Sequence, residues 1–343
     1  MTQSMTSAAR ATAVLTRARR LTEPGLRTAL DMLPAPLDRM ANYHFGWCDA
    51  EGNATDTGWG KGLRAGLTTA AAEACGAAPD AAAPMAVAIE LMHNFSLVHD
   101  DVLDTDRIRR GRPTVWAQWG VPAAICLGDA LHAGGIQVLA RELPGDQAAA
   151  AVTRLESVVA ELCRGQCVDC AFDGRTTVKV SEYLAMATGK TGALMGAACT
   201  LGASVAEADP ATMAAFDAFG STLGLAFQVV DDLLGIWGDP AVTGKTAGND
   251  LIARKWSYPV AAALESGTST AAARELTRLY HSDTTITSAD AARIAALMSD
   301  AGIEQQTRRF AARQAEAAIA ALPDQVIADD LIALTDLVVR RDR

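Results

Sequence analysis

Acidic and basic side chains crowd into one short stretch of this chain, "HDDVLDTDRIRRGRPTVW", residues 99–116. Its charged residues are Asp100, Asp101, Asp104, Asp106, Arg107, Arg109, Arg110 and Arg112. On a helix that turns about 100° per residue, the first three aspartates share one face, whereas Asp106 points elsewhere. Like charges at this spacing repel one another unless a cation lies among them, and Mg²⁺ prefers oxygen ligands. A solvated acidic face would not explain why the apolar run "IELMHNFSLV" leads directly into the charges. The stretch therefore predicts a metal site.

A second acidic pair follows another apolar stretch, "GLAFQVVDDLLG". Asp231 and Asp232 end this predicted helix, and Gln228 lies one turn before them. Two aspartate pairs that each end an apolar helix are expected to face each other across a cavity, where they would hold several metal ions against a diphosphate. Apolar side chains below them would then accept a hydrocarbon tail.

The two motifs in this order, DDxxD followed by RRG and then GxxxFQxxDD, resemble the trans-isoprenyl diphosphate synthases of the polyprenyl synthetase family. Smaller matches extend the resemblance from Gly60 to Pro259. The resemblance implies head-to-tail prenyl transfer, in which isopentenyl diphosphate and an allylic diphosphate are joined by ionisation, condensation and elimination. It also implies several Mg²⁺ ions per active site, bound by Asp100, Asp101, Asp104, Asp169, Asp231 and Asp232.

Basic residues near the first motif match the family's diphosphate-binding positions. By this resemblance Arg109 contacts the allylic diphosphate, and Arg110 contacts the isopentenyl diphosphate. The further positions on the isopentenyl diphosphate are Lys61, Arg64 and His93. Because guanidinium groups suit multiply charged phosphates, the arginines and the aspartates are expected to flank the same phosphates. His93 lies on the same helical face as Asp100, which favours a site role over that of a core histidine.

Further matches lie between and after the two acidic motifs. By resemblance Lys190 stabilises the leaving diphosphate, and Asp169 adds a carboxylate on the metal side. The other matching positions are Gln166, Thr191, Gln228, Lys245, Asp250 and Lys255. The segment 244–250 is predicted to close over the site, with Lys245 and Lys255 on phosphate and Asp250 beside them. Closure is expected to exclude water, because an exposed allylic cation would hydrolyse.

The chain departs from the family pattern in the second motif and at two prolines. Gly235 replaces the third aspartate of that motif, which predicts weakened metal binding rather than inactivity. Ala65 and the run "GKTAGND" each lack a proline that family members commonly have.

Product length is predicted from the residues just before the first aspartate. In the family, a bulky residue five places before that aspartate blocks the growing tail, and Phe95 occupies this place. Ser96, beside it, is small. The pair predicts a short product, with C20 (geranylgeranyl diphosphate) favoured over C15 (farnesyl diphosphate).

Helical periodicity dominates the chain, and no segment is predicted as a convincing strand. Half of the 343 residues are hydrophobic, only 5% are aromatic, and alanine is abundant, which favours close-packed helices. No repeat and no Pro/Ser/Gly-rich linker marks a boundary. We therefore expect an all-α fold, a single large helical bundle around a central cavity, formed by residues 23–343. Residues 1–22 are expected to form a tail or the start of a first helix that ends near Pro24.

Composition also limits the expected partners. The formal net charge of −10, with no basic stripe, argues against nucleic-acid binding. No apolar run is found that approaches the roughly 20 residues needed to span a bilayer, so no transmembrane segment is expected. Seven cysteines without a secretory signal predict a reduced, cytoplasmic protein, although the Arg-rich start also fits a targeting segment. The family resemblance implies a homodimer.

Other classes of protein compete with this interpretation. Cys163, Cys167 and Cys170 have the C-x3-C-x2-C spacing of an iron–sulfur site, but this spacing is also one face of a helix. "ELMH" and "DALH" offer the acid-x-x-His pairs of a di-iron protein, which needs further glutamates. A class I terpene synthase shares DDxxD, but "NDLIARKWS" lacks the later serine and glutamate of its second metal motif. Gly235 leaves open a weakly active subunit of a heteromeric prenyl synthase.

Overall fold

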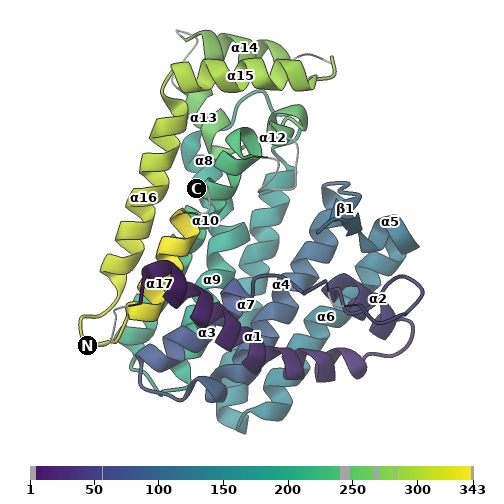
Figure 1. The fold of residues 1–343 in the computed structure, drawn as a ribbon, viewed down its shortest axis with the longest axis vertical. Helices are drawn as coiled ribbons and strands as arrows, with labels where there is room; N and C mark the ends of the chain where they lie inside the picture. Colours follow the sequence, from purple (N-terminus) through teal and green to yellow (C-terminus); the bar gives the residue numbers. More distant parts are fainter. Residues whose placement is uncertain are drawn as a thin grey trace. The chain divides into compact units, whose positions relative to one another are not determined.

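The computed structural model describes residues 5–55, 57–239, 248–265, 270–280, 282 and 284–340, and nearly all of its regular structure is helical (Figure 1). The predicted all-α fold is confirmed. Within these residues, strand pairing is limited to the hairpin of β1 (Ile108–Arg109) and β2 (Arg112–Pro113) and to one bridge between Cys48 and Ala54. The chain divides into two compact units, and each is described by itself.

The first unit comprises Met1–Val159, Ala197–Asp217 and Leu322–Leu334. Its helices are α1 (Ser7–Asp31), α2 (Leu37–Phe45), α3 (Leu63–Ala74), η1 (Pro79–Ala82), α4 (Ala83–Leu103), α5 (Val115–Trp119), α6 (Val121–Glu142) and most of α7 (Gly145–Cys170). Helix α4 packs along α6 on one side and against α1 and α3 on another. It is therefore apolar on several faces, as expected for a central helix.

Helix α1 does not end near Pro24, as the sequence predicts, but continues to Asp31 with the proline inside it. A proline within a helix removes one hydrogen bond and costs about 3 kcal/mol. The apolar face of α1 continues past the proline, where Leu26 and Leu30 are almost completely buried. Burial of these side chains offsets the loss at Pro24, and this tertiary contribution is invisible in the local sequence.

Three helices are long and apolar enough to cross a membrane, judged by length and composition alone. They are Pro79–Leu103, Val121–Glu142 and Pro210–Trp237, with 67%, 39% and 44% of their most apolar window buried inside the protein. The criterion allows up to two charged residues in the window, whereas the sequence analysis looked for an apolar run without interruption, so the expectation of no transmembrane segment stays a prediction. Two thirds of the Pro79–Leu103 window is already covered by protein.

The second unit comprises Ala160–Gly196, Ala218–Ala321 and Thr335–Arg343. Its elements begin with the end of α7, α8 (Val180–Ala187) and a π-helical turn, η2 (Thr188–Gly192). They continue with parts of α9 (Ala193–Ser204), α10 (Pro210–Trp237) and α17 (Asp329–Val339). The remaining helices are α12 (Asn249–Ile252), α13 (Tyr258–Glu265), α14 (Ala271–Tyr280), α15 (Ser288–Asp300) and α16 (Ile303–Ala321). Helices α14 and α15 lie side by side (Figure 1), and a core that includes Phe172, Tyr183 and Met298 joins these elements.

Candidate active site

The first acidic motif ends α4 and places Asp101 in the interior of the first unit. Asp101 is 1% exposed, and its Oδ1 atom accepts a hydrogen bond from Arg109 Nε at 2.7 Å. Its Oδ2 atom is buried with no hydrogen-bond partner among the described residues. Burial raises the pKa of Asp101 to about 6, against the opposing effect of Arg109. The arginine therefore satisfies only part of this carboxylate, and the free oxygen would gain from a cation.

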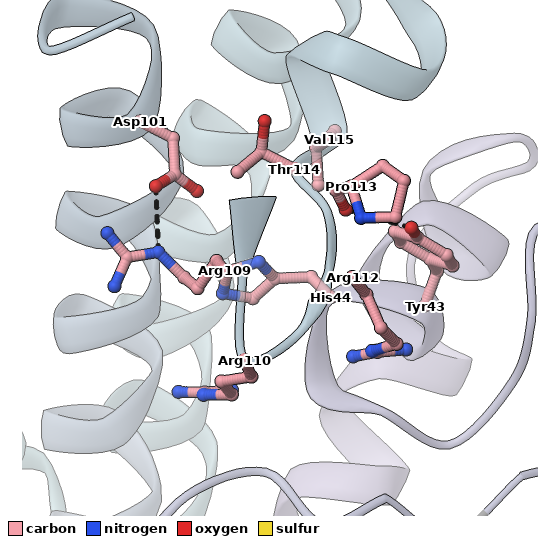
Figure 2. A pocket seen from close by; sticks show the side chains of 9 residues that line it. All are labelled: Tyr43, His44, Asp101, Arg109, Arg110, Arg112, Pro113, Thr114 and Val115. Atoms are coloured by element: carbon pink, nitrogen blue, oxygen red, sulfur yellow. Dashed lines mark hydrogen bonds and ion pairs between the residues drawn. The ribbon is translucent and has the colours of Figure 1, made fainter. Parts of the chain in front are cut away.

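A pocket lies beside Asp101, between the hairpin and α2 (Figure 2). It is lined by Tyr43, His44, Asp101, Arg109, Arg110, Arg112, Pro113, Thr114 and Val115. Arg109 and Arg112 are cross-strand partners, and like charges directly opposite each other destabilise a hairpin. Arg112 Nε is also buried without a hydrogen-bond partner among the described residues. Asp101 and Arg112 both line this pocket, and each has one buried polar atom without a hydrogen-bond partner among the described residues.

Two histidines near the arginines are held neutral. His44 Nε2 lies 3.0 Å from Asn94 Oδ1, and the Asn94 amide donates to Glu90 O at 2.8 Å, so His44 is the donor in this pair. Arg64 Nη1 lies 3.1 Å from His93 Nε2, which must therefore accept. Desolvation, followed by the charge of Arg110 for His44 and of Arg64 for His93, lowers the pKa of both histidines well below the ordinary value. Neutral imidazoles add polar groups without adding to the repulsion among the arginines.

Sequence analysis did not identify some of the residues that line this pocket. His44, Tyr43 and Arg112 line the pocket, although the sequence interpretation gave none of them a role. The Arg112 guanidinium lies over the Tyr43 ring, 4.9 Å from its centroid. Arg112 stands in the same short stretch as Arg109, so its charge was a usable signal. His44 is far from every motif in sequence, so no local pattern identifies it.

Three other residues of this unit that the sequence predicted, Lys61, Phe95 and Ser96, lie outside this pocket. Lys61 is exposed just before α3. Phe95 is buried, with its ring 5.0 Å from His99 and 5.4 Å from His132, and Ser96 Oγ donates to His93 O at 2.8 Å. Neither Phe95 nor Ser96 lines the pocket of Figure 2, so their predicted effect on product length stays a prediction.

The second acidic motif places Asp232 in the core of the second unit, fixed by three donors. Its Oδ2 atom accepts from the Tyr183 hydroxyl and, at 2.7 Å, from the backbone N–H of Tyr258. Its Oδ1 atom accepts from Gln228 Nε2 at 3.1 Å, while Gln228 Oε1 accepts from Thr191 at 2.8 Å. Burial raises the pKa of Asp232 to about 7 despite these bonds. This chain of contacts brings together three residues that the sequence predicted: Asp232, Gln228 and Thr191.

Asp169 and Lys190 are also brought together, in the second unit. Lys190 Nζ lies 2.7 Å from Asp169 Oδ2. The contact depends on a close approach of α7 to the π-helical turn η2, because a Cβ on Gly165 would lie 2.3 Å from the Lys190 backbone nitrogen. Only glycine allows this approach, and π-helical turns often accompany functional sites.

The segment after the second motif is described only from residue 248 onward. Lys245 lies outside the described residues, whereas Lys255 is exposed after α12. The Asp250 carboxylate lies against Gly235 of α10, and a Cβ on that glycine would come within 2.0 Å of Asp250 Oδ2. Within the described parts of the chain, no group of three or more His, Cys, Asp or Glu side chains has the geometry to hold a metal ion by itself. A metal would therefore need further oxygens, such as those of phosphate or water.

The helical fold and the carboxylate and basic groups of its two sites are compatible with an enzyme that binds phosphorylated substrates. The polyprenyl synthetase family model matches residues 50–298, so the chain belongs to the polyprenyl synthetase family. It is a prenyltransferase. The family resemblance drawn from the two aspartate motifs is confirmed, and a terpene cyclase is not favoured.

Two curated relatives are prenyl diphosphate synthases of Mycobacterium tuberculosis. The chain is 50% identical to a geranylgeranyl diphosphate synthase over 330 residues, which cover 96% of this chain and 94% of that protein. It is 46% identical to a (2E,6E)-farnesyl diphosphate synthase over 247 residues, which cover 72% of this chain and 68% of that protein. The two names differ in product, so family membership alone does not set the product length.

Solved structures agree with the fold. A polyprenyl synthetase from Streptomyces coelicolor A3(2) superposes with a TM-score of 0.90 at 44% identity, covering 95% of this chain and 99% of that one. A polyprenyl synthase from Caulobacter crescentus CB15, complexed with calcium and isoprenyl diphosphate, has a TM-score of 0.83 at 28% identity, covering 99% and 100%. The predicted isoprenoid-synthase fold is thereby confirmed.

The two competing metal sites gain no support from the geometry. Glu90 and His93 of "ELMH" are engaged with Ala65 and Arg64, and His132 of "DALH" pairs with Glu156 at 2.8 Å. Cys163, Cys167 and Cys170 lie on α7 and are not disulfide-bonded. None of these side chains belongs to a metal-competent group among the residues that the structure describes.

Proposed function

We propose that this chain condenses isopentenyl diphosphate with an allylic diphosphate and releases geranylgeranyl diphosphate, C20, in preference to farnesyl diphosphate, C15. The observation that carries the proposal is the buried Oδ2 atom of Asp101, which has no hydrogen-bond partner among the described residues and belongs to a pocket lining that also includes Arg109, Arg110 and Arg112. A cation bound to a diphosphate would give this oxygen a partner, and the arginines would bind the phosphate groups. The C20 product is supported by 50% identity, along almost the whole chain, to a protein named geranylgeranyl diphosphate synthase.

The metal in this proposal is Mg²⁺, with several ions per active site. The unpaired oxygen of Asp101 fits a hard cation, and so does a donor set made only of carboxylates. The residues that would hold the ions are Asp100, Asp101, Asp104, Asp169, Asp231 and Asp232. When bound, the metal supplies Lewis-acid chemistry that weakens the carbon–oxygen bond of the allylic diphosphate.

The basic residues bind and orient the two diphosphates. Arg109 is proposed to contact the allylic diphosphate, with Arg110 on the isopentenyl diphosphate. The other groups proposed to bind diphosphate are Lys61, Arg64, His93, Lys190, Thr191, Gln228, Lys245 and Lys255. Neutral His93 accepts from Arg64, which keeps that guanidinium oriented for phosphate. Lys190, which pairs with Asp169, stabilises the diphosphate as it leaves.

The organic step then follows from the substrates' own chemistry. The isopentenyl double bond attacks the allylic cation, a new carbon–carbon bond forms, and the released diphosphate takes the proton that is lost. Apolar walls keep water from the cation, and Phe95 is proposed to stop the growing tail. We further propose that residues 23–343 act as one catalytic domain, and that the chain works as a homodimer in the cytoplasm.

Product mass tests the proposal most directly. The purified chain is incubated with Mg²⁺, isopentenyl diphosphate and, in turn, the C5, C10 and C15 allylic diphosphates. We expect C20 diphosphate from the starters and no reaction when EDTA replaces free Mg²⁺. A C15 end product would overturn the chain-length assignment, a cyclic hydrocarbon would indicate a cyclase, and absence of product would indicate a subunit that needs a partner.

A further inference from the structure

The N-terminal helix α1 carries arginines that the proposed function leaves without a role. Arg10 and Arg17 each pair with Asp330 of α17, at 3.0 Å and 2.9 Å. Arg19 lies on the same helix but contacts an aromatic ring, that of Trp59, whose centroid lies 5.4 Å from the guanidinium carbon. These arginines therefore belong to the folded first unit, and Arg19 connects α1 with the segment ahead of α3.

Trp59 is held by α1 through both its ring and its N–H group. Its side chain is 1% exposed. The Nε1 atom donates at 3.3 Å to Oε2 of Glu23, which lies one turn after Arg19 on α1 and also pairs with Arg27. An arginine over the ring and a hydrogen bond to its N–H fix the position of the tryptophan. They thereby also hold its neighbours, residues 57–62 (the glycine loop).

The glycine loop carries Lys61 and brings its backbone close to two arginines. A Cβ on Gly62 would lie 3.0 Å from Arg19 Cγ, and Gly62 has φ +66°. A Cβ on Gly60 would lie 3.3 Å from Arg110 Nη2, and Gly60 has φ +122°. Glycine is the residue that combines such positive φ angles with so close an approach. Lys61 therefore stands between two glycines, one against Arg19 and the other against Arg110.

Arg19 also belongs to the charges around Glu90. This carboxylate on α4 is 3% exposed, and its Oε1 atom accepts from the backbone N–H of Ala65 at 3.0 Å. Burial raises the pKa of Glu90, and the charges of Arg64, Arg110 and Arg19 oppose the rise. Because Arg64 and Arg110 are proposed to bind the isopentenyl diphosphate, Arg19 lies within electrostatic range of that site.

We propose that Arg19 is a positioning residue of the isopentenyl diphosphate site, which holds the glycine loop so that Lys61 reaches the diphosphate. The inference rests on the proposed function, because that function assigns Lys61 to this substrate. Arg19 acts through Trp59 and Gly62 rather than by touching the substrate. Because Arg19 lies ahead of residue 23, this role extends the proposed catalytic domain into α1.

Calorimetric titration of the full chain with isopentenyl diphosphate, in the presence of Mg²⁺ and an unreactive thio analogue of the allylic diphosphate, tests this role without turnover. Arg19→Ala frees one face of Trp59, so we expect the affinity to fall about tenfold through misplacement of Lys61. Arg19→Lys keeps a cation over the ring and should recover most of this loss. Arg17→Ala is the matched control, because it removes an arginine of the same helix that pairs with Asp330 instead.

A double-substitution cycle shows whether Arg19 acts through Lys61. With saturating allylic diphosphate, Arg19→Ala should lower kcat/KM for isopentenyl diphosphate about tenfold in the unmodified chain and less than about twofold in the Lys61→Ala background. The KM for the allylic diphosphate should change by less than about twofold, because the glycine loop is proposed to serve the other substrate. An equal loss of kcat/KM in both backgrounds overturns the positioning role.

The possible results separate this inference from the proposed function. If the unmodified chain does not bind isopentenyl diphosphate, the proposed function fails. If it binds, and Arg19→Ala binds equally well or Arg17→Ala loses as much, the role of Arg19 is overturned. A loss confined to Arg19→Ala, with recovery in Arg19→Lys, supports both. Thermal melts confirm folding, and Arg19→Gln, which keeps the stem against Gly62, replaces Arg19→Ala if that variant does not fold.

Discussion

Tyr183 donates its hydroxyl to Oδ2 of Asp232 in the core of the second unit. The backbone N–H of Tyr258 donates to the same oxygen, so this carboxylate is fixed in orientation before any ligand binds. Tyr183 has no role in the sequence interpretation, yet it holds a residue that the second motif identifies.

Tyr183→Phe should weaken the function of Asp232 while leaving the fold intact. Loss of the hydroxyl frees one side of the carboxylate, and we expect kcat with saturating substrate to fall about tenfold or more, with a higher Mg²⁺ requirement. Tyr258→Phe is the matched control, because it also loses one hydroxyl but keeps the N–H that bonds to Asp232. Equal effects of the two substitutions on the Mg²⁺ requirement would contradict a positioning role for Tyr183.

Asp101→Asn should separate function from stability. The amide keeps the size of the side chain but cannot bind a cation as a carboxylate does, so Mg²⁺-dependent pyrophosphate binding should weaken by about tenfold or more. The melting temperature should stay the same or rise, because a neutral group replaces a buried carboxylate with one unpaired oxygen. Calorimetry and thermal melts measure the two effects, with Asp106→Asn as control. A large drop in melting temperature would show that Asp101 is mainly structural.

Phe95→Ala should lengthen the product. Removal of this buried ring opens space beside α4 and costs about 3 kcal/mol of unfolding free energy. Phe216→Ala, at a fully buried ring on α10, should cost a similar amount and leave the product unchanged. Mass spectrometry of the products distinguishes the two variants. Products of unchanged length from Phe95→Ala would refute its role as the end of the tail pocket.

Glu275→Gln should remove a pH-dependent contribution to stability. Hydrogen bonds from Arg278 and then Arg293 lower the pKa of Glu275 to about 2, from its ordinary 4.5. Because the pKa of Glu275 is lower in the folded than in the unfolded chain, the ionised side chain stabilises the fold at pH values above about 4.5. This stabilisation is lost as the pH falls from about 4.5 toward 2. Because both arginines are about half exposed, we expect only about 1 kcal/mol at pH 7.

Urea unfolding between pH 7 and pH 3 measures this contribution. The difference between the unmodified chain and Glu275→Gln should shrink as the pH falls below about 4.5, because Glu275 then gains a proton in the unfolded chain while it keeps its charge in the fold until about pH 2. Glu265→Gln, at the exposed end of α13, controls for the loss of one acidic charge. A difference that stays constant across this range would rule out the linkage.

The sequence by itself determined the class of fold and the chemistry of the two acidic motifs. Alanine-rich helical periodicity acts over neighbouring turns, so it predicts helices without knowledge of their partners. Motif spacing works in the same way: three aspartates on one helical face imply a cation, whichever helices surround them. The family assignment followed from these short-range patterns, and the comparisons confirmed it.

Only the tertiary structure decided which distant residues meet. Burial beyond Pro24 kept α1 continuous, the Asn94 amide set the tautomer of His44, and packing of α12 brought Asp250 against Gly235. No local sequence pattern predicts these contacts, because each depends on how elements far apart in the chain pack together. Sequence patterns identify the residues that can do chemistry, whereas packing determines which residues they contact and which protonation states they adopt.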